Sequence, residues 1–155
     1  PTPDTIAGGL TTIEEKSLGA IAKTGARQIE RVVGYGERPP HRGLWLMEGP
    51  AGAVENITGL AAAGAQIVLF VTGSCNPVGH PVSPTIKICA NPATLARMAE
   101  HIDVDLSHGF TGSFSVEQGA EEIAGVAAEI AAGRRTAAER LGFLETNISR
   151  FGLSV

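Results

Sequence analysis

The chain has 155 residues, of which 43% are hydrophobic and 18% are charged, so it can form one compact domain with its own core. A formal net charge of −4 argues against a nucleic-acid partner, because phosphate binding needs clustered Lys and Arg side chains. No apolar run approaches the roughly 20 residues that cross a bilayer and no signal peptide is visible, so we expect no membrane partner.

A helix is predicted near the amino end, after an extended leading segment over residues 1–10 that ends in a Gly pair. Residues 11–15 (TTIEE) carry the signal for its start, because two overlapping Thr-x-x-Glu pairs fit the spacing of a capping box. Gly25 is the expected stop of this helix.

Strands alternate with helices along the rest of the chain. The run 66–71 (QIVLFV) is apolar on both faces, as expected for the centre of a parallel sheet. Lys87 lies on the opposite face of its strand from its apolar neighbours, so we interpret it as solvent-facing, although it could also meet an anion. The other predicted elements are strands over 29–33, 44–47, 86–90 and 102–106, and helices over 52–63, 92–100 and 136–148.

The longest predicted helix begins at a Ser115-x-x-Gln118 capping box and ends at Gly133. Its expected buried stripe comprises Val116, Ala120, Ile123, Ala127 and Ile130. The order of elements predicts an α/β fold. We expect a single domain over residues 1–155, with a mainly parallel sheet of about five short strands flanked by helices and a helical tail over 115–150.

The Gly pair and the helix start form the first candidate site. Gly8 and Gly9 would expose backbone N–H groups beside the positive end of a helix, which is a natural seat for a carboxylate or phosphate. The same turn offers two hydroxyls, two carboxylates and an ammonium that together could hold a divalent metal and an acidic substrate: Thr11, Thr12, Glu14, Glu15 and Lys16. The alternative is a capped helix with a charged face.

The second candidate is the loop over 72–81, which follows the strongest strand. Ligands of open α/β sheets bind beyond the carboxyl ends of strands, and the glycines of this loop would let its backbone approach an anion. Cys75 and His80 lie five residues apart, so a thiolate pair is conceivable. The alternative is a long surface loop. Cys75 and Cys89 give no disulfide framework, which indicates reduced thiols in a cytoplasmic protein.

The third candidate is the alternating strand over 102–106. His101, Asp103 and Asp105 share one of its faces, with neighbours about 6.6 Å apart along the strand. These side chains could form part of a metal site, and a solvated strand face is the alternative.

The segment Gly8–Gly19 (GGLTTIEEKSLG) resembles the hallmark of the altronate dehydratase and galactarate dehydratase family, to which the large subunit of sulfolactate sulfo-lyase is also similar. The likeness covers most of residues 5–110, with further matches at 35–39, 43–44, 63–70, 72–73, 84–87 and 102–103. Family members are longer, and this chain starts at Pro1 without Met. The resemblance therefore implies a carboxy-terminal domain whose active site is shared with an upstream domain of the same enzyme; a homo-oligomer is a further expectation.

The resemblance implies a hydro-lyase (dehydratase) that removes water from a hydroxy acid such as altronate or galactarate to give a 2-keto-3-deoxy acid, with the isolated chain inactive. It also implies a divalent ion, Fe²⁺ or alternatively Mg²⁺ or Mn²⁺, to stabilise the charge formed when the proton beside the carboxylate is removed. The expected catalytic residues are Glu14, Glu15 and Lys16, with Glu14 and Glu15 as metal ligands. The expected substrate-binding residues are Gly8, Gly9, Thr11, Thr12, Thr72 and Gly73.

One departure from the family pattern bears on the substrate. Members typically have Thr-Gly-Arg-Gly-Thr-Pro after the strand, where this chain has Ser74–Cys75–Asn76 in place of the central three residues. An arginine can grip a carboxylate through a bidentate fork and Ser74 cannot, which indicates a different hydroxy acid. The alternatives are a carbon–sulfur lyase acting on a sulfo-hydroxy acid such as sulfolactate, and a non-catalytic binding or oligomerisation module.

Overall fold

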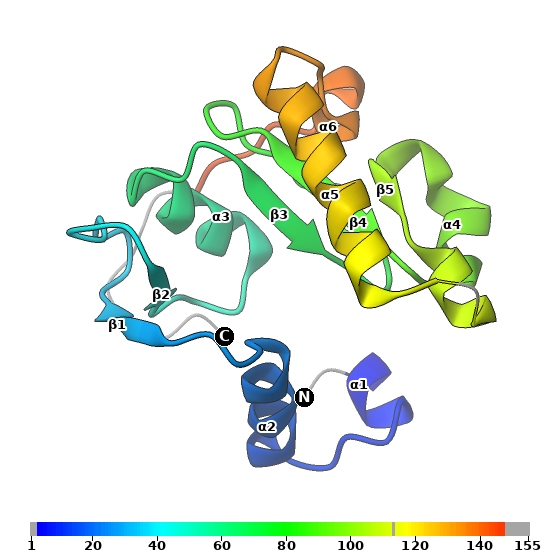
Figure 1. Cartoon of the computed structure of the whole chain (residues 1–155), viewed down its shortest axis with the longest axis horizontal. Coiled ribbons are helices and arrows are strands. Elements are labelled where there is room, and N and C mark those ends of the chain that lie inside the picture. The colour runs from blue at the N-terminus through cyan, green and yellow to red at the C-terminus, as the bar shows by residue number, and fades with distance from the viewer. Residues whose placement is uncertain (1–2, 113, 148–155) are drawn as a thin grey trace.

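A computed structural model describes residues 3–112 and 114–147. The helices are α1 (Pro3–Ala7), α2 (Ile13–Lys23), α3 (Ala53–Ala62), α4 (Pro92–Met98), α5 (Val116–Ala131) and α6 (Ala137–Leu141), with 3-10 turns at Ala99–His101 and Ser107–Thr111. The strands are β1 (Ile29–Val33), β2 (Leu44–Met47), β3 (Val68–Val71), β4 (Thr85–Cys89) and β5 (Val104–Asp105). Figure 1 shows α1 and α2 lying apart from β3, β4 and β5. Among these described helices, none is long and apolar enough to cross a membrane.

β4 is the central strand of a three-stranded parallel sheet whose edges are β3 and β5. All five residues of β4 are buried, which is what a strand covered on both faces requires. The expectation that 66–71 lies at the sheet centre is therefore wrong. β3 has one neighbouring strand, and its outward side chains Leu69 and Val71 are 52% and 77% exposed.

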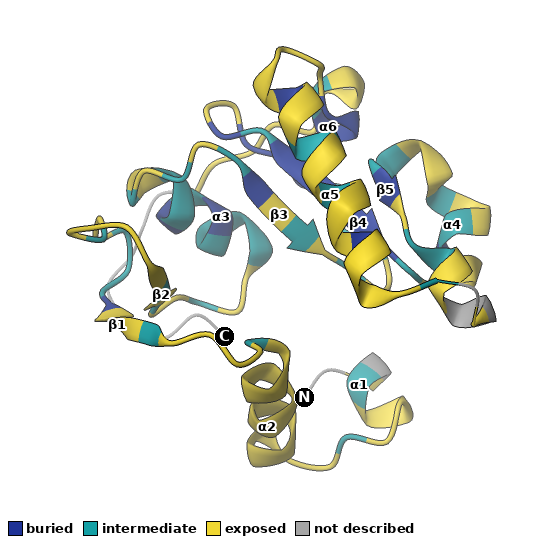
Figure 2. Ribbon diagram, in the orientation of Figure 1, coloured by how far each residue is buried: buried dark blue, intermediate teal, exposed yellow. Residues whose placement is uncertain are grey.

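Two hydrophobic clusters hold helices against this sheet. In the first, α5 packs on one face of β4, and the buried members are Ile86, Ile88, Val104 and Ile130. In the second, α3 packs beside β3, and the buried members are Ile57, Val68 and Val78. Figure 2 shows the buried residues concentrated on β4 and on the helix faces turned toward it. Removal of this apolar surface from water is the main stabilising contribution to the unit.

β1 and β2 form a separate parallel pair, with Ile29 opposite Leu44 and Val33 opposite Met47. The predicted α/β class, the mainly parallel pairing and the five short strands are confirmed. The strands divide between two sheets in the described chain instead of forming one sheet.

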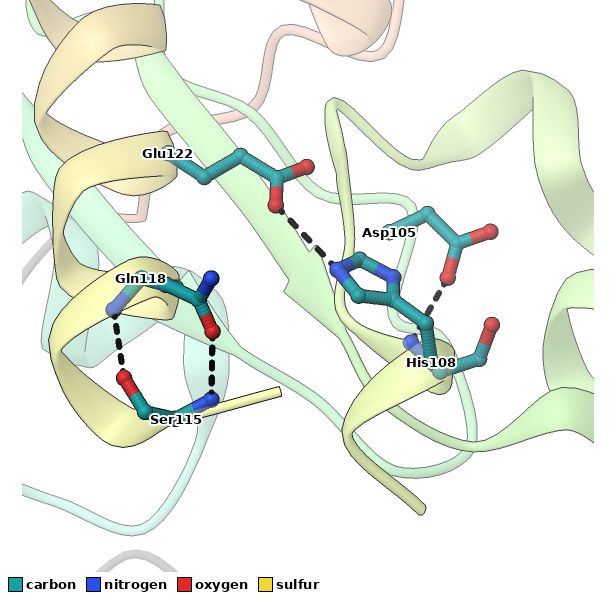
Figure 3. A network of polar contacts seen from close by, with 6 residues as sticks. Asp105, His108, Ser115, Gln118 and Glu122 are labelled. Atoms are coloured by element: carbon teal, nitrogen blue, oxygen red, sulfur yellow. Dashed lines mark hydrogen bonds and ion pairs between the residues drawn. The ribbon is translucent and has the colours of Figure 1, made fainter. Parts of the chain in front are cut away.

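Local signals place several helix ends correctly. Gly25, Gly64 and Gly133 follow helices and adopt positive φ angles of 73°, 98° and 106°, which favour glycine. At the start of α5, the Gln118 N–H donates to the Ser115 hydroxyl and the Ser115 N–H donates to the Gln118 side chain, as Figure 3 shows. The predicted capping box is therefore confirmed.

The amino-terminal segment differs from its prediction. Residues 1–10 are not extended throughout, because α1 begins at Pro3, and proline is well suited to the first turn of a helix. Gly9 adopts a φ of 101° and donates its N–H to the Ile6 carbonyl oxygen, so the Gly pair ends α1.

Two predicted elements near the carboxyl end are shorter than expected. The helix predicted over 136–148 ends at Leu141, because Gly142 adopts a left-handed φ of 78°, and residue 148 lies outside the described residues. The strand predicted over 102–106 is shorter, since β5 comprises Val104–Asp105, although the N–H groups of Asp103 and Leu106 also donate to carbonyl oxygens of β4.

The predicted buried stripe of α5 is confirmed over its last three members. Ile130 is buried in the sheet cluster, and Ile123 and Ala127 are half-buried against it. Val116 is 85% exposed and Ala120 is exposed, so the prediction is wrong for the first turns of the helix. In this part of α5 the buried residue is Gly119, which lies against Phe114 and Leu106.

Two helix glycines should respond in opposite ways to alanine substitution. A Cβ at Gly59 would overlap the ring of Tyr35, whose hydroxyl is anchored 2.6 Å from the Glu55 carbonyl oxygen, so Gly59→Ala should destabilise the fold by about 1–3 kcal/mol. A Cβ at Gly125 meets no atom within 4 Å, so Gly125→Ala should stabilise α5 by about 0.5–1 kcal/mol. Urea unfolding of both variants tests this, and equal effects would contradict it.

Candidate functional site

The amino-terminal candidate site lies at the start of α2, where several of its polar groups already form hydrogen bonds with one another. Thr12 is the N-cap residue, and its hydroxyl accepts a bond of 3.1 Å from the Glu15 N–H. The Glu15 carboxylate accepts bonds from the Thr11 backbone N–H and hydroxyl at 2.9 and 2.8 Å. These bonds hold the pKa of the Glu15 carboxyl below its ordinary value. Of the two overlapping Thr-x-x-Glu pairs, the one led by Thr12 therefore caps the helix.

Glu14 and Lys16 are the uncommitted groups of this segment. Both are exposed, and neither side chain forms a hydrogen bond or ion pair with another described residue. Gly8 is exposed in the preceding turn, but the Gly9 N–H already donates to a carbonyl oxygen at 2.9 Å. The groups left available for a ligand at this turn are therefore fewer than the sequence indicates.

None of the residues of α2 is buried, and Figure 2 shows the helix exposed along its length. Over residues 3–112 and 114–147, no group of three or more His, Cys, Asp and Glu side chains is arranged to hold a metal ion. A metal bound by Glu14 or Glu15 would need further ligands from outside this part of the chain.

The second candidate segment starts at the carboxyl ends of β3 and β4, as predicted. The Gly73 carbonyl oxygen accepts bonds from Asn91 Nδ2 at 3.0 Å and from Thr94 Oγ1 at 2.6 Å. The Thr72 N–H extends the pairing with β4 by one bond. Thr72 and Gly73 are thus fixed at the sheet edge. They share no hydrogen bond or ion pair with Gly8–Lys16 in the part of the chain that the structure describes.

Lys87, interpreted from the sequence as solvent-facing, is completely buried at the middle of β4. Its ammonium donates to the carbonyl oxygen of Val78 and to that of Pro77, the latter at 3.4 Å. Its Nζ lies 5.6 Å from the centre of the Phe70 ring, within range of a cation–π interaction. The interpretation was wrong because the segment after β3 folds back over this face of the sheet and covers it.

The Asp103 carboxylate links β4 and α6. One carboxylate oxygen accepts the Lys87 backbone N–H at 2.9 Å, and the other accepts the Ala137 N–H of α6 at 2.7 Å. Burial lowers the pKa of Lys87, while the negative charge of the Asp103 carboxylate, and that of the Cys75 side chain when ionised, act in the opposite direction. The sequence signal that could have indicated these two residues is a lone lysine in an otherwise apolar strand, together with an aspartate at the start of the next predicted strand.

The third candidate site is not assembled. Asp103 is engaged as described, and Asp105 accepts the Ser107 N–H at 2.8 Å, capping the next turn. Figure 3 shows Asp105 beside His108, whose Nε2 lies 3.4 Å from the Glu122 carboxylate of α5. His101 therefore has no pair of carboxylates with which to bind a metal within the described residues.

Cys75 and His80 do not form an activated pair. Burial raises the pKa of the Cys75 thiol, which opposes thiolate formation. The His80 Nδ1 atom accepts N–H bonds from Val82 and Ser83, both at 3.2 Å, and burial lowers the pKa of the His80 ring. Cys75 and Cys89 are both free thiols.

A cavity of about 320 Å³ lies between the β1–β2 pair and α3. Its wall includes the apolar side chains of Trp45, Met47 and Leu60, together with Glu37 and Arg38. Tyr35–Pro39 belongs to the family resemblance, so part of that motif lines a cavity to which the sequence analysis assigned no role. None of the predicted catalytic or substrate-binding residues lines it.

A family model described as D-galactarate/altronate dehydratase, C-terminal, matches residues 1–154. The chain is 42% identical over 151 residues to (2R)-sulfolactate sulfo-lyase subunit beta of Chromohalobacter salexigens, covering 97% of this chain and 39% of the relative. It is 37% identical over 155 residues to altronate dehydratase of Escherichia coli, covering 100% and 31%. It is 30% identical over 135 residues to galactarate dehydratase (L-threo-forming) of Escherichia coli, covering 87% and 26%. The chain thus spans less than two fifths of the length of each of these relatives.

The buried lysine should give the protein a distinctive pH dependence. Because the pKa of Lys87 is lower in the folded state, the unfolded chain binds more protons between that lowered pKa and the ordinary value of 10.5. The free energy of unfolding of the wild type, relative to Lys87→Met, should therefore rise with pH through this window. Urea unfolding at several pH values measures it, with Lys23→Met as the exposed control. A wild-type to Lys87→Met difference that stays constant with pH would contradict the prediction.

Proposed function

The chain belongs to the D-galactarate/altronate dehydratase family, and from this premise we propose that it is the carboxy-terminal part of a lyase that acts on a small hydroxy acid. The observation that carries the proposal is the match over residues 1–154, which includes the Gly8–Lys16 motif at the start of α2. We propose loss of water as the reaction, a sugar acid such as altronate or galactarate as substrate, and a 2-keto-3-deoxy acid as product. The proposal includes a cytoplasmic location, which the two free thiols favour.

The hard step of such a reaction is removal of the proton from the carbon beside the carboxylate, because negative charge then develops on that carboxylate. Lys16 would neutralise this charge, which its exposed and uncommitted ammonium supports. Glu14 or Glu15 would transfer a proton or bind the metal. The geometry favours Glu14, because the Glu15 carboxylate already accepts two bonds from Thr11. The proposed substrate contacts are Gly8, Gly9, Thr11, Thr12, Thr72 and Gly73.

The proposed metal is Fe²⁺, with Mg²⁺ or Mn²⁺ as alternatives, and when bound it would stabilise the developing charge. The donor set fits part of such a site. Glu14 offers an uncommitted carboxylate, but Glu15 lies about 100° further around the helix, so the two do not converge on one ion. The remaining ligands, and the general base, would come from the upstream part of the enzyme.

The second candidate reaction is carbon–sulfur cleavage of a sulfo-hydroxy acid such as sulfolactate. It needs the same proton abstraction with a different leaving group. The 42% identity to a (2R)-sulfolactate sulfo-lyase subunit supports it, as does Ser74 at the position where an arginine is usual.

The function is tested with the chain joined to its upstream part. After chelation and addition of each metal separately, the enzyme is incubated with altronate, galactarate and sulfolactate, and 2-keto-3-deoxy acid and sulfite are measured. The keto-deoxy acid supports the hydro-lyase, whereas sulfite release supports the carbon–sulfur lyase. Turnover of none of the three acids with any of the metals would favour a non-catalytic binding or oligomerisation module.

Glu14→Gln in the same enzyme should abolish turnover while leaving the fold intact. The substitution removes the uncommitted carboxylate and breaks no hydrogen bond or ion pair among the described residues. Glu117→Gln, in the first turn of α5, is the matched control and should keep full activity. Circular dichroism checks the fold, and near-normal turnover of the Glu14→Gln variant would remove Glu14 from the mechanism.

A further inference from the structure

α2 lacks the burial that normally stabilises a helix. It has 11 residues, and none of them is buried. Isolated helices shorter than roughly 12–15 residues are marginal in water, and most helices in proteins gain their stability by packing an apolar face. The N-cap at Thr12 contributes only about 1 kcal/mol, which does not replace that packing.

α2 nevertheless carries an apolar stripe, formed by Ile13, Leu18 and Ile21, which are 70%, 67% and 66% exposed. At about 100° per residue, these three side chains span about 140° of the helix circumference. Glu14 falls inside this arc, whereas Glu15 and Lys16 fall outside it. The α2 stripe is therefore a continuous face suited to packing, with one carboxylate on it.

We propose that the α2 stripe docks on the upstream part of the same enzyme. More than half of each relative lies outside the match, since the chain covers 39% of one and 31% of another. The matching family model is C-terminal, so that extra length precedes the matched part. α1 and α2 are the first elements of the chain, and tethering to preceding polypeptide gives a high effective concentration that a second copy lacks.

This inference rests on the proposed function in placing the site at the boundary between two parts of one enzyme. Docking along the stripe turns Glu14 toward the upstream part and leaves Glu15 and Lys16 on the flanks. Metal ligands and a base supplied by the upstream part would then meet Glu14 at the same boundary. One helix thus carries both the docking face and the polar motif.

Hydrogen–deuterium exchange of α2 tests the proposal. It is measured on the 155-residue chain alone and on the same chain joined to its upstream part. The α2 amides should exchange rapidly in the chain alone and at least about tenfold more slowly in the joined enzyme.

Two sets of variants sharpen the test. Leu18→Gln combined with Ile21→Gln keeps helix propensity but removes apolar surface, so it should abolish the slowing. Val116→Gln replaces an apolar residue at the start of α5 that is 85% exposed, more than Leu18 or Ile21, and should leave the slowing unchanged.

Equal exchange of α2 with and without the upstream part overturns the proposal, as does slowing that survives the double substitution. Protection of α2 in the chain alone that increases with concentration, together with a dimer in sedimentation, overturns it in favour of a second copy. The readout is exchange and not turnover, so these outcomes are distinct from a failed lyase assay. Intact docking without turnover would count against the proposed reaction alone.

Discussion

The ammonium group of Lys87 lies between the central strand and the segment that folds back over it. Moving an ammonium group from water into the protein interior costs roughly several kcal/mol, unless hydrogen bonds and an opposite charge offset the loss of hydration. The carbonyl oxygens of Pro77 and Val78 accept hydrogen bonds from this ammonium. These bonds fix the distance between the sheet and the backbone of the segment after β3. The half-buried Asp103 carboxylate accepts the backbone N–H of Lys87 and the first N–H of α6, so Lys87 and Asp103 together link β4, the segment after β3 and α6.

The same arrangement fixes the edge of the sheet where Thr72 and Gly73 are proposed to contact the substrate. The covering segment is held at one end by bonds from Asn91 and Thr94 to the Gly73 carbonyl oxygen, and at the other by Lys87. Between these anchors Cys75 adopts a φ of 62°, an unusual conformation for a residue other than glycine. Such a conformation persists where the surroundings determine it, and the bonds at both ends of the segment supply that constraint here.

The features that the sequence predicts correctly are those set by neighbours in the chain. Gly64 and the Ser115 cap act through backbone geometry within a few residues, and the structure has both as expected. The features that it predicts wrongly depend on what lies above a strand. Alternation shows that Lys87 faces away from the isoleucines of β4, but it cannot show that a Pro-rich segment covers that face. Likewise, the apolar run 66–71 indicates burial without indicating whether a strand pairs on both sides.

The candidate site shows the same division between local and distant effects. The spacing of Thr12 and Glu15 predicts a helix cap, and the cap forms. At the same helix start, the backbone N–H and hydroxyl of Thr11 donate to the Glu15 carboxylate, which is then less available to a ligand. The sequence alone does not show which of the two adjacent carboxylates stays available. What Glu14 meets is set by the surface on which α2 packs. An 11-residue helix with no buried residue is marginal in water, so under the proposed docking the upstream part would both order the motif and complete the site.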